Sequence, residues 1–309
     1  MPELPEVETT KTSLKPLLDQ KITKVEVFQP QLRWSMPTDL TLLEGYCLHS
    51  VDRRAKYLIL TLVPSSSTQS DSNVLTDNTE QSATKKLLIH LGMSGSLQQH
   101  PHGMAKRKHD HLILTFSDIN TLSTQLHYHD PRRFGSILWY EDYATKLLEH
   151  LGVEPLSNDF TADYLYQLIQ RTSASNPIEN PVKKQQPIKK AIKSVIMDQQ
   201  VVVGVGNIYA AESLYLSGIH PATPADQISY EQVSLLVAHI KSILIKAIQL
   251  GGSTLRDFTV ASGQTGYFQQ TLNVYGRQGE PCIRCKNVLE NIKLNGRASI
   301  YCAKCQPLK

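Results

Sequence analysis

The chain has 309 residues, of which 40% are hydrophobic and 19% charged, and its formal net charge is +4. This length favours about two domains, and the apolar content is sufficient for a packed core. No apolar run approaches the roughly 18 residues of a membrane span. The first residues also lack the basic and apolar regions of a secretory signal. These features exclude a membrane or secreted protein and predict a cytoplasmic one.

The chain begins MPELPEVETT, which places two prolines and three acidic residues among the first eight positions: Pro2, Glu3, Pro5, Glu6 and Glu8. Proline suits the first helical turn, and acidic residues suit the positive end of the helix dipole. Apolar residues from Val7 to Leu18 have the spacing of one helical face, so a helix starting near Pro5 explains the pattern. Removal of Met1 would instead leave Pro2 as a terminal secondary amine beside a carboxylate. Local physics leaves both interpretations open.

Residues 21–140 are rich in strand signals, in the stretches KITKVEVF, YLILTLV, KLLIHLG, HLILTFS and GSILWY. Strands at this spacing predict a sandwich or barrel rather than βαβ units. Between two of them, residues 64–84 contain ten Ser or Thr in 21 positions and almost no apolar side chains. Such a segment cannot bury enough surface to order itself, so we predict a flexible insertion.

From Glu141 onward the apolar period becomes helical. Helical spacing recurs around residues 164–169, 188–196 and 228–250, whereas residues 173–187 contain three prolines and are predicted to form a surface loop. The last 35 or so residues change character again and carry two CxxC turns. The predicted layout is therefore a β-rich domain over residues 1–140, a helical domain over 141–265 and a small metal-bound hairpin over 266–309.

Four of the five cysteines form Cys282-x-x-Cys285 and Cys302-x-x-Cys305, with sixteen residues between the pairs, while Cys47 stands apart. An intracellular protein rarely keeps structural disulfides, so paired CxxC turns indicate a metal site. Four thiolates close a tetrahedral zinc site and leave no position for a substrate water, which predicts one structural Zn²⁺.

Basic residues gather in three clusters: Lys183 to Lys193, Lys106 to His109, and Arg132 with Arg133. No acidic cluster balances them. A run of charge is often only a solvated face, but three such clusters favour a nucleic-acid partner.

Glycine-containing stretches supply further candidates. VVVGVGNIYAAE, residues 201–212, fails as a dinucleotide fingerprint because Tyr209 occupies the place of the third glycine. We predict a helix–turn–helix corner there, with Asn207 at the start of the second helix as a cap, or as part of a phosphate site. HLGMSGSL contains Met93, and DPRRFG contains Arg132, Arg133 and Phe134. Ordinary turns explain both stretches. Alternatively, the arginines of DPRRFG bind phosphates or base edges, and Phe134 acts as a stacking wedge.

These stretches together resemble the formamidopyrimidine-DNA glycosylase family of bacterial repair enzymes. The matching stretches are MPELPEVET, RRAKYL, HLGMSGSL, KHDH, DPRRFG, LGVEPLS, MDQQVVVGVGNIYAAESL, SGIHP, GYF, VYGRQGEPC and the CxxC pair, which span nearly the whole chain. The endonuclease VIII group, which prefers oxidised pyrimidines, has a similar layout, but MPELPEVET and DPRRFG favour the purine-specific branch. The resemblance implies an α+β fold with an N-terminal β-sandwich, a helix–two-turn–helix domain and a C-terminal zinc-finger β-hairpin.

The resemblance also implies roles for individual residues. Pro2 matches the nucleophile, Glu3 the catalytic acid and Lys56 the lysine of β-elimination. Arg297 matches the zinc-finger arginine of phosphate binding and δ-elimination. The implied DNA contacts are Met93, His109, Arg132, Arg133, Phe134, Lys189 and Asn207, of which Met93, Arg132 and Phe134 fill the gap left by the flipped base. Lys190 competes with Lys189 for its assignment.

The implied activity is excision of oxidised purines, 8-oxoguanine and formamidopyrimidines, from duplex DNA. It proceeds by base flipping, a Schiff base at the terminal proline and β,δ-elimination, in a monomer with no membrane partner. The chain departs from the family in the 64–84 insertion and at Lys286, where the family often has glycine. The alternative is a DNA-binding protein without catalysis, which would leave Pro2, Glu3 and Lys56 without a function.

Overall fold

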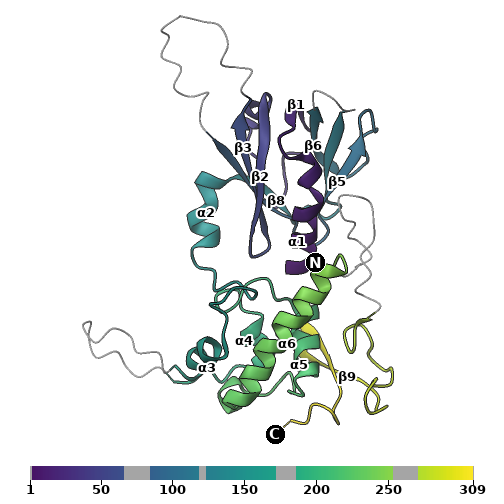
Figure 1. Ribbon diagram of the computed structural model, residues 1–309. Coiled ribbons are helices and arrows are strands. Elements are labelled where there is room, and N and C mark those ends of the chain that lie inside the picture. The colour runs from purple at the N-terminus through teal and green to yellow at the C-terminus, as the bar shows by residue number, and fades with distance from the viewer. Residues whose placement is uncertain (1, 66–83, 118–122, 172–185, 253–270, 309) are drawn as a thin grey trace, which may run out of the picture. The chain divides into compact units, whose positions relative to one another are not determined.

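The computed structural model describes residues 2–65, 84–117, 123–171, 186–252 and 271–308 (Figure 1). The chain divides into two compact units: Met1–Glu149 with Leu250–Gln269, and His150–Gln249 with Gln270–Lys309. Most of the predicted insertion and of the proline-containing loop, and the GYF stretch, lie outside the described residues. Within the described part of the chain, no helix is long and apolar enough to cross a membrane.

The first unit is built on one antiparallel sheet of eight strands in the order β5-β7-β6-β1-β2-β3-β4-β8. The strands are β1 (Lys21–Val27), β2 (Tyr46–Arg54), β3 (Tyr57–Pro64), β4 (Lys85–His90), β5 (Ser96–Pro101), β6 (Asp110–Ser117), β7 (Thr124–His129) and β8 (Ser136–Trp139). A single residue pair, Lys21 with Cys47, joins β1 to β2. The sheet therefore divides there into two four-stranded layers, which is the predicted β-sandwich.

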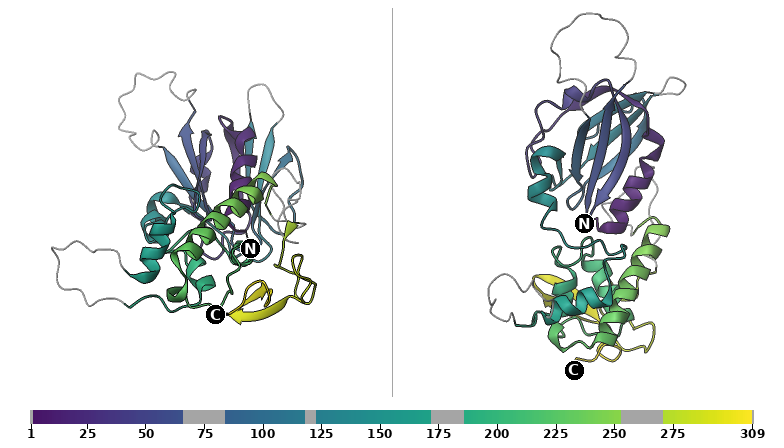
Figure 2. Two further views of the ribbon diagram at one scale, coloured as in Figure 1. Left: turned by 60° about the horizontal axis from the view of Figure 1, so that its bottom comes forward. Right: turned by 60° about the vertical axis from the view of Figure 1, so that its left-hand side comes forward.

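Apolar side chains from both layers form the core of this unit. Leu48, Leu60 and Leu87 come from one layer, and Leu114 and Leu126 come from the other. Two α-helices flank the sheet (Figure 2): α1 (Leu4–Ser13) packs against β2 and β3, and α2 (Tyr140–Leu148) packs against β4 and β8. Two short 3₁₀ helices, η1 (Lys15–Leu17) and η2 (Leu40–Leu43), add buried leucines beneath the strands.

The five predicted strand regions correspond to β1, β3, β4, β6 and β8, whereas β2, β5 and β7 were not predicted. These three strands lack a clean apolar alternation: β7 reads TQLHYH and β5 reads SLQQHP. In the sheet β2 pairs with β3, β7 pairs with β6 and β5 pairs with β7, and local pattern does not reveal these pairings.

The second unit contains the helices α3 (Ala162–Gln170), α4 (Ile192–Ile196), α5 (Asn207–Leu216) and α6 (Tyr230–Gln249), with a 3₁₀ turn η4 (Ala225–Gln227). The three helical patterns of the sequence are thus present, although Ile188 precedes α4 rather than belonging to it. The predicted cap at Asn207 was wrong: Gly206 is the N-cap, and Asn207 is the first helical residue. Gly206 has the extended backbone of an N-cap residue, and no side chain donates or accepts a capping hydrogen bond there.

A two-stranded hairpin completes this unit, with β9 (Glu290–Leu294) paired to β10 (Arg297–Tyr301). Asn295 and Gly296 form its turn with φ values of 48° and 75°, which is the backbone that an Asn-Gly pair adopts most readily in tight hairpins. The hairpin packs against α5, and together they bury Tyr215, Cys282 and Cys302.

Candidate active site and DNA interface

Pro2 and Glu3, the first residues that the structure describes, are buried and held by the start of α1. Pro2 is buried and Glu3 is 2% exposed at the N-cap of α1. Glu3 and Glu6 form a capping box, in which the Glu6 carboxylate accepts from the Glu3 backbone N–H at 2.8 Å. Gly252 lies against the same carboxylate, since a Cβ there would be 3.2 Å from Glu6 Cγ. The helix start therefore fixes the backbone of the proline and glutamate that were predicted to be catalytic.

Lys56 lies in the two-residue turn between β2 and β3 and is 9% exposed. Its neighbour Ala55 has a left-handed backbone with a φ of 53°. Arg53 holds this turn by donating from Nη1 to the Ala55 carbonyl at 2.8 Å, and it also pairs with Glu8 of α1 at 2.7 Å. This chain of contacts connects the turn that carries Lys56 to α1, which Pro2 and Glu3 directly precede.

His90 was not predicted as a site residue, yet its ring lies in the same neighbourhood. Burial, followed by the charges of Lys56 and Arg33, lowers the pKa of His90 to about 4. Its Nδ1 accepts from the Gly92 backbone N–H at 3.0 Å, so the neutral ring carries its proton on Nε2. Pairing of β3 with β4 brings the ring beside Lys56, and no local signal in HLGMSGSL indicates this.

A second residue missed from the sequence, Asp130, organises the exposed loops. Its carboxylate is fully buried and accepts from Ser94 Oγ at 2.7 Å, the Gly135 N–H at 2.9 Å and the Tyr128 hydroxyl at 3.3 Å. Burial and the Asp130 charge raise the pKa of Tyr128 well above its usual value, which keeps the hydroxyl a donor. Ser94 in turn accepts from the Arg132 N–H at 3.2 Å. One carboxylate thus joins the HLGMSGSL and DPRRFG loops.

The joined loops expose three side chains that the sequence singled out. Met93 is 39% and Phe134 45% exposed, and the Arg132 guanidinium lies 5.1 Å from the centre of the Phe134 ring. Gly92 has a φ of 66°, and a side chain there would collide with the Phe134 and Gly135 backbone. Glycine is therefore required for the close approach of the two loops. The three predicted gap-filling residues are brought together on a rigid support.

His109 lies in a different cluster, centred on Asp110. The two oxygens of this buried carboxylate contact His127 Nδ1 at 2.9 Å, His129 Nδ1 at 2.8 Å and the Arg107 guanidinium at 3.0 Å. Burial alone would raise the pKa of Asp110, but these hydrogen bonds, with His129 and Arg107 foremost, hold it far below its usual value. The His109 ring lies 5.8 Å from that of His129.

In the second unit the predicted DNA contacts lie on separate elements. Lys189 and Lys190 are both exposed just before α4, while Asn207 opens α5. Arg297 is exposed at the first position of β10. Buried Lys193 holds the next two residues of β10, because its Nζ donates to the Ala298 carbonyl at 3.1 Å and to Ser299 Oγ at 2.8 Å.

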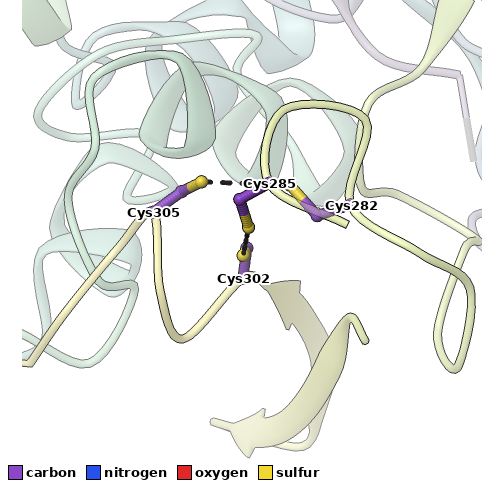
Figure 3. A group of neighbouring side chains, drawn as sticks. All are labelled: Cys282, Cys285, Cys302 and Cys305. Atoms are coloured by element: carbon purple, nitrogen blue, oxygen red, sulfur yellow. Dashed lines mark hydrogen bonds between the residues drawn. The ribbon is translucent and has the colours of Figure 1, made fainter. Parts of the chain in front are cut away.

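The four predicted metal ligands converge from the two CxxC turns (Figure 3). Their sulfurs all lie within 4.8 Å of one another, with Cys285 and Cys302 at 3.4 Å and Cys282 and Cys305 at 3.9 Å. Sulfurs around one tetrahedral zinc with bonds of about 2.3 Å are separated by roughly 3.8 Å, so this geometry fits a single ion. Among the described residues, this is the one group of three or more His, Cys, Asp or Glu side chains placed to hold a metal.

The electrostatics of the four thiols also fit a bound cation. Burial would raise the pKa of Cys282, but a hydrogen bond from the Tyr215 hydroxyl at 3.2 Å and neighbouring backbone N–H groups lower it to about 6. Burial and the adjacent sulfurs raise the pKa of Cys305 to about 12. A divalent ion compensates the charge that four thiolates would otherwise concentrate in one place.

A buried carboxylate and a left-handed backbone residue shape the segments that flank this hairpin. Buried Glu212 of α5 accepts from the backbone N–H groups of Asn273, Val274 and Tyr275 at 2.8, 2.8 and 2.9 Å, which fixes the segment leading to Cys282. Lys286 has a left-handed backbone with a φ of 65°. This conformation explains why glycine suits that position, because glycine adopts it without steric cost.

Comparison with known families places three domains along the chain. Residues 1–137 match the formamidopyrimidine-DNA glycosylase N-terminal domain, residues 151–259 the formamidopyrimidine-DNA glycosylase H2TH domain, and residues 279–308 the zinc finger found in FPG and IleRS. These matches agree with the β-sandwich, the helices and the four-cysteine hairpin described above. The class is therefore a DNA glycosylase with a zinc finger.

Full-length relatives are similar over the entire chain. The formamidopyrimidine-DNA glycosylase of Psychrobacter arcticus is 68% identical over 100% of this chain and 99% of its own length. That of Acinetobacter baylyi is 52% identical over the same shares. The crystal structure of Lactococcus lactis Fpg (MutM) with N7-benzyl-Fapy-dG DNA has a TM-score of 0.79 at 31% identity, covering 99% of this chain and all of that one. The chain belongs to the formamidopyrimidine-DNA glycosylase family.

Proposed function

We propose that Pro2, freed by removal of Met1, is the nucleophile of a bifunctional DNA glycosylase and AP lyase. The chain has the activity of its family, which is excision of oxidised purines from duplex DNA in base excision repair. The observation that carries the residue assignment is the connection of buried Pro2 and Glu3 to the Lys56 turn through Glu8, Arg53 and the Ala55 carbonyl. Solved relatives hold Fapy-dG DNA and abasic-site DNA, which supports the same substrates for this chain.

The nucleophile would be the secondary amine of Pro2. An α-amine has an ordinary pKa of about 7.7–8.0, so a useful fraction of it is unprotonated at pH 7. A lysine has an ordinary pKa of about 10.4 and is almost fully protonated there. Attack at the sugar C1′ forms the N–C1′ bond and expels the damaged base. Opening of the C1′–O4′ bond, with a proton delivered to O4′, then gives an iminium that withdraws electrons from the sugar. Glu3, adjacent to the amine, is the group we assign to proton transfer at this centre.

Lys56 would act in the elimination that follows. The iminium acidifies the proton on the neighbouring sugar carbon, and its removal breaks the bond to the 3′ phosphate. Burial first, and then the positive charges of Lys56 and Arg33, lower the pKa of His90, and these two cations suit a DNA phosphate. We assign His90 Nε2–H as a neutral donor to that phosphate.

The loops joined by Asp130 would meet the gap in the duplex. Rotating a base out of the stack leaves an empty space and an unpaired partner, and both are costly. Met93 and Phe134 are exposed and apolar and so can fill the space. Arg132 offers a rigid donor fork to the unpaired base, and Arg133 is assigned to phosphate.

The second unit would bind the phosphate backbone. Exposed Lys189 and Arg297 carry the charge, Asn207 and the N-terminus of α5 add donors, and His109 is retained as a contact from the first unit. Zinc, when bound by the four cysteines, supplies folding energy to the hairpin that carries Arg297. Arg297 is also assigned to the δ-elimination. We further propose that the protein works as a monomer on cytoplasmic DNA, with domain boundaries near residues 140 and 265.

A cleavage assay tests this function. A duplex with one 8-oxoguanine opposite cytosine is incubated with the full chain, and products are separated on a denaturing gel. We expect strand scission at the lesion with phosphates on both new ends, and no scission of undamaged duplex. Tight binding without scission by protein that begins at Pro2 would favour the non-catalytic alternative.

A further inference from the structure

One face of the β5-β7-β6 layer combines burial with polarity. Alternate residues on these strands, Leu97, Leu126 and Tyr128 among them, point into the apolar core. The residues between them point to the opposite face and are polar: on β5 and β7 they include Gln98, His100, Gln125, His127 and His129. Gln98 and Gln125 are each 8% exposed and His127 is fully buried, so this part of the outer face is covered, while His100 and His129 are half-buried.

Three atoms on this face have no hydrogen-bond partner within the part of the chain that the structure describes: His100 Nε2, His127 Nε2 and Gln125 Oε1. They are neighbours, because His100 is directly opposite Gln125 in the β5–β7 ladder and the His100 and His127 rings are 4.7 Å apart. A buried polar atom without a partner costs about 1–3 kcal/mol, and natural proteins hold few of them. Three together indicate a bound group that satisfies all three.

The protonation of His127 identifies the chemistry. Its Nδ1 lies 2.9 Å from Asp110 Oδ2, and Asp110 remains ionised through its contacts with Arg107 and His129. In the neutral imidazole this hydrogen bond places the proton on Nδ1 and a lone pair on Nε2. A histidine that donates one nitrogen to a carboxylate and offers the other is the arrangement typical of metal ligands.

We propose that His100, His127 and Gln125 form a second metal site, which takes one divalent transition-metal ion of the zinc class. Two imidazoles bound to one zinc at about 2.0–2.1 Å have ring centres roughly 5 Å apart, close to the separation seen here. Nitrogen ligands favour zinc over calcium or magnesium, which prefer oxygen throughout. Asp110 supplies a compensating negative charge behind His127.

The neutral state that ligation requires is already favoured at His100. Burial, and then the nearby His127 and Arg107, lower the pKa of this imidazole, so it is unprotonated at neutral pH. The bound ion would connect β5 to β7, and His127 would link it to the Asp110 carboxylate. It uses none of the four cysteines and none of the residues assigned to catalysis.

Metal stoichiometry tests the proposal. The full chain is stripped of metal, equilibrated with Zn²⁺, dialysed against metal-free buffer and measured for bound zinc. We expect two ions per chain for the unaltered protein and one for His127→Asn or His100→Asn. His102→Asn, which alters an exposed histidine on the adjoining loop, is the matched control and should retain two.

The design separates ligation from folding. At position 127 asparagine keeps an N–H for Asp110 while removing Nε2. Gln125→Leu replaces the whole carboxamide, including the proposed ligand Oε1, by methyl groups at similar volume, so it provides a third variant if His127→Asn fails to fold. Co²⁺ gives a second readout: the cysteine site shows thiolate charge-transfer absorption, and the second equivalent should add only weaker ligand-field bands that disappear in His100→Asn. One ion in the unaltered protein, or two in both histidine variants, would overturn the proposal and assign the space to water.

Discussion

The loops around Asp130 and the hairpin around the four cysteines both present exposed side chains, but they are held by different means. Asp130 is a buried carboxylate within a unit whose apolar core draws on both sheet layers. The hairpin has two five-residue strands and a small core on α5. A segment this short buries too little apolar surface to order itself, so it depends on the metal.

The comparison teaches which perturbations each region tolerates. In the first unit the rest of the sheet remains folded if one hydrogen bond is lost, so a change at Asp130 should act locally. In the hairpin the ligands are themselves much of the core, because Cys282 and Cys302 are both fully buried. Loss of one ligand there should affect the whole element.

The largest effect is expected from Cys282→Ser. The variant should lose its zinc, and because structural zinc contributes about 10–16 kcal/mol in isolated fingers, the hairpin should lose its order. We expect DNA affinity to fall at least about a hundredfold through loss of Arg297 positioning. Zinc content and binding to a lesion-containing duplex measure this. Cys47→Ser, a change outside the site, should be neutral, and full DNA binding by zinc-free protein would contradict the account.

Asp130→Asn should break the loop support without unfolding the sheet. The amide places a donor against donors, which costs about 1–3 kcal/mol of stability. We expect a lower melting temperature and single-turnover excision slowed by roughly 5- to 150-fold, with DNA affinity less affected. Asp52→Asn, at an exposed position of β2, is the control. A variant that excises 8-oxoguanine at the normal rate would show that loop rigidity is not needed.

Arg132→Ala should act on the choice of opposite base. Unpaired cytosine offers acceptors to the guanidinium, whereas adenine presents a donor, so cleavage opposite cytosine should be faster by about 5- to 150-fold in the unaltered protein. The variant should lose most of that ratio, while Phe134→Ala should slow cleavage opposite every base. Single-turnover rates on the two duplexes measure this. An intact ratio with uniformly lower rates would assign Arg132 to phosphate.

The salt dependence of DNA affinity shows which side chains of the second unit contact DNA phosphates. Each phosphate neutralised adds about −0.9 to the slope of log K against log salt. Lys189→Ala and Arg297→Ala should each make the slope shallower by roughly one unit. Lys190→Ala is the matched variant, since it is equally exposed, and it should leave the slope unchanged. A change at Lys190 alone would transfer the contact to that residue.

The smallest effect is expected at the Glu8–Arg53 pair, which is partly exposed and so contributes on the order of 0.2–1 kcal/mol. Burial would raise the pKa of Glu8, but Arg53 and Lys11 lower it below its ordinary value of 4.5. A lowered folded pKa means that the stabilisation is present above that value and is lost as pH falls through the folded pKa. Glu8→Gln should therefore lower the melting temperature at pH 7, and this difference should shrink as pH falls below 4.5. Glu26→Gln, from the exposed Lys24–Glu26 pair, is the control.

The sequence predicted what depends on local pattern. The CxxC spacing predicted the metal ligands, apolar alternation located β1, and apolar runs of strand length located β3 and β4. It did not reveal Asp130, whose carboxylate reaches Ser94 across 36 positions of chain. It also missed His90 and strand β7, because polar residues such as Gln125 and His127 are buried only once β5, β6 and β7 pair.

The central assignment is the nucleophile, and borohydride trapping tests it most directly. Protein that begins at Pro2 is mixed with 8-oxoguanine duplex and borohydride, and the covalent adduct is digested and mapped by mass spectrometry. We predict an adduct whose DNA is linked to the Pro2 nitrogen, and none when Met1 is retained. An adduct that maps to Lys56, or that forms equally with the blocked terminus, would contradict the assignment.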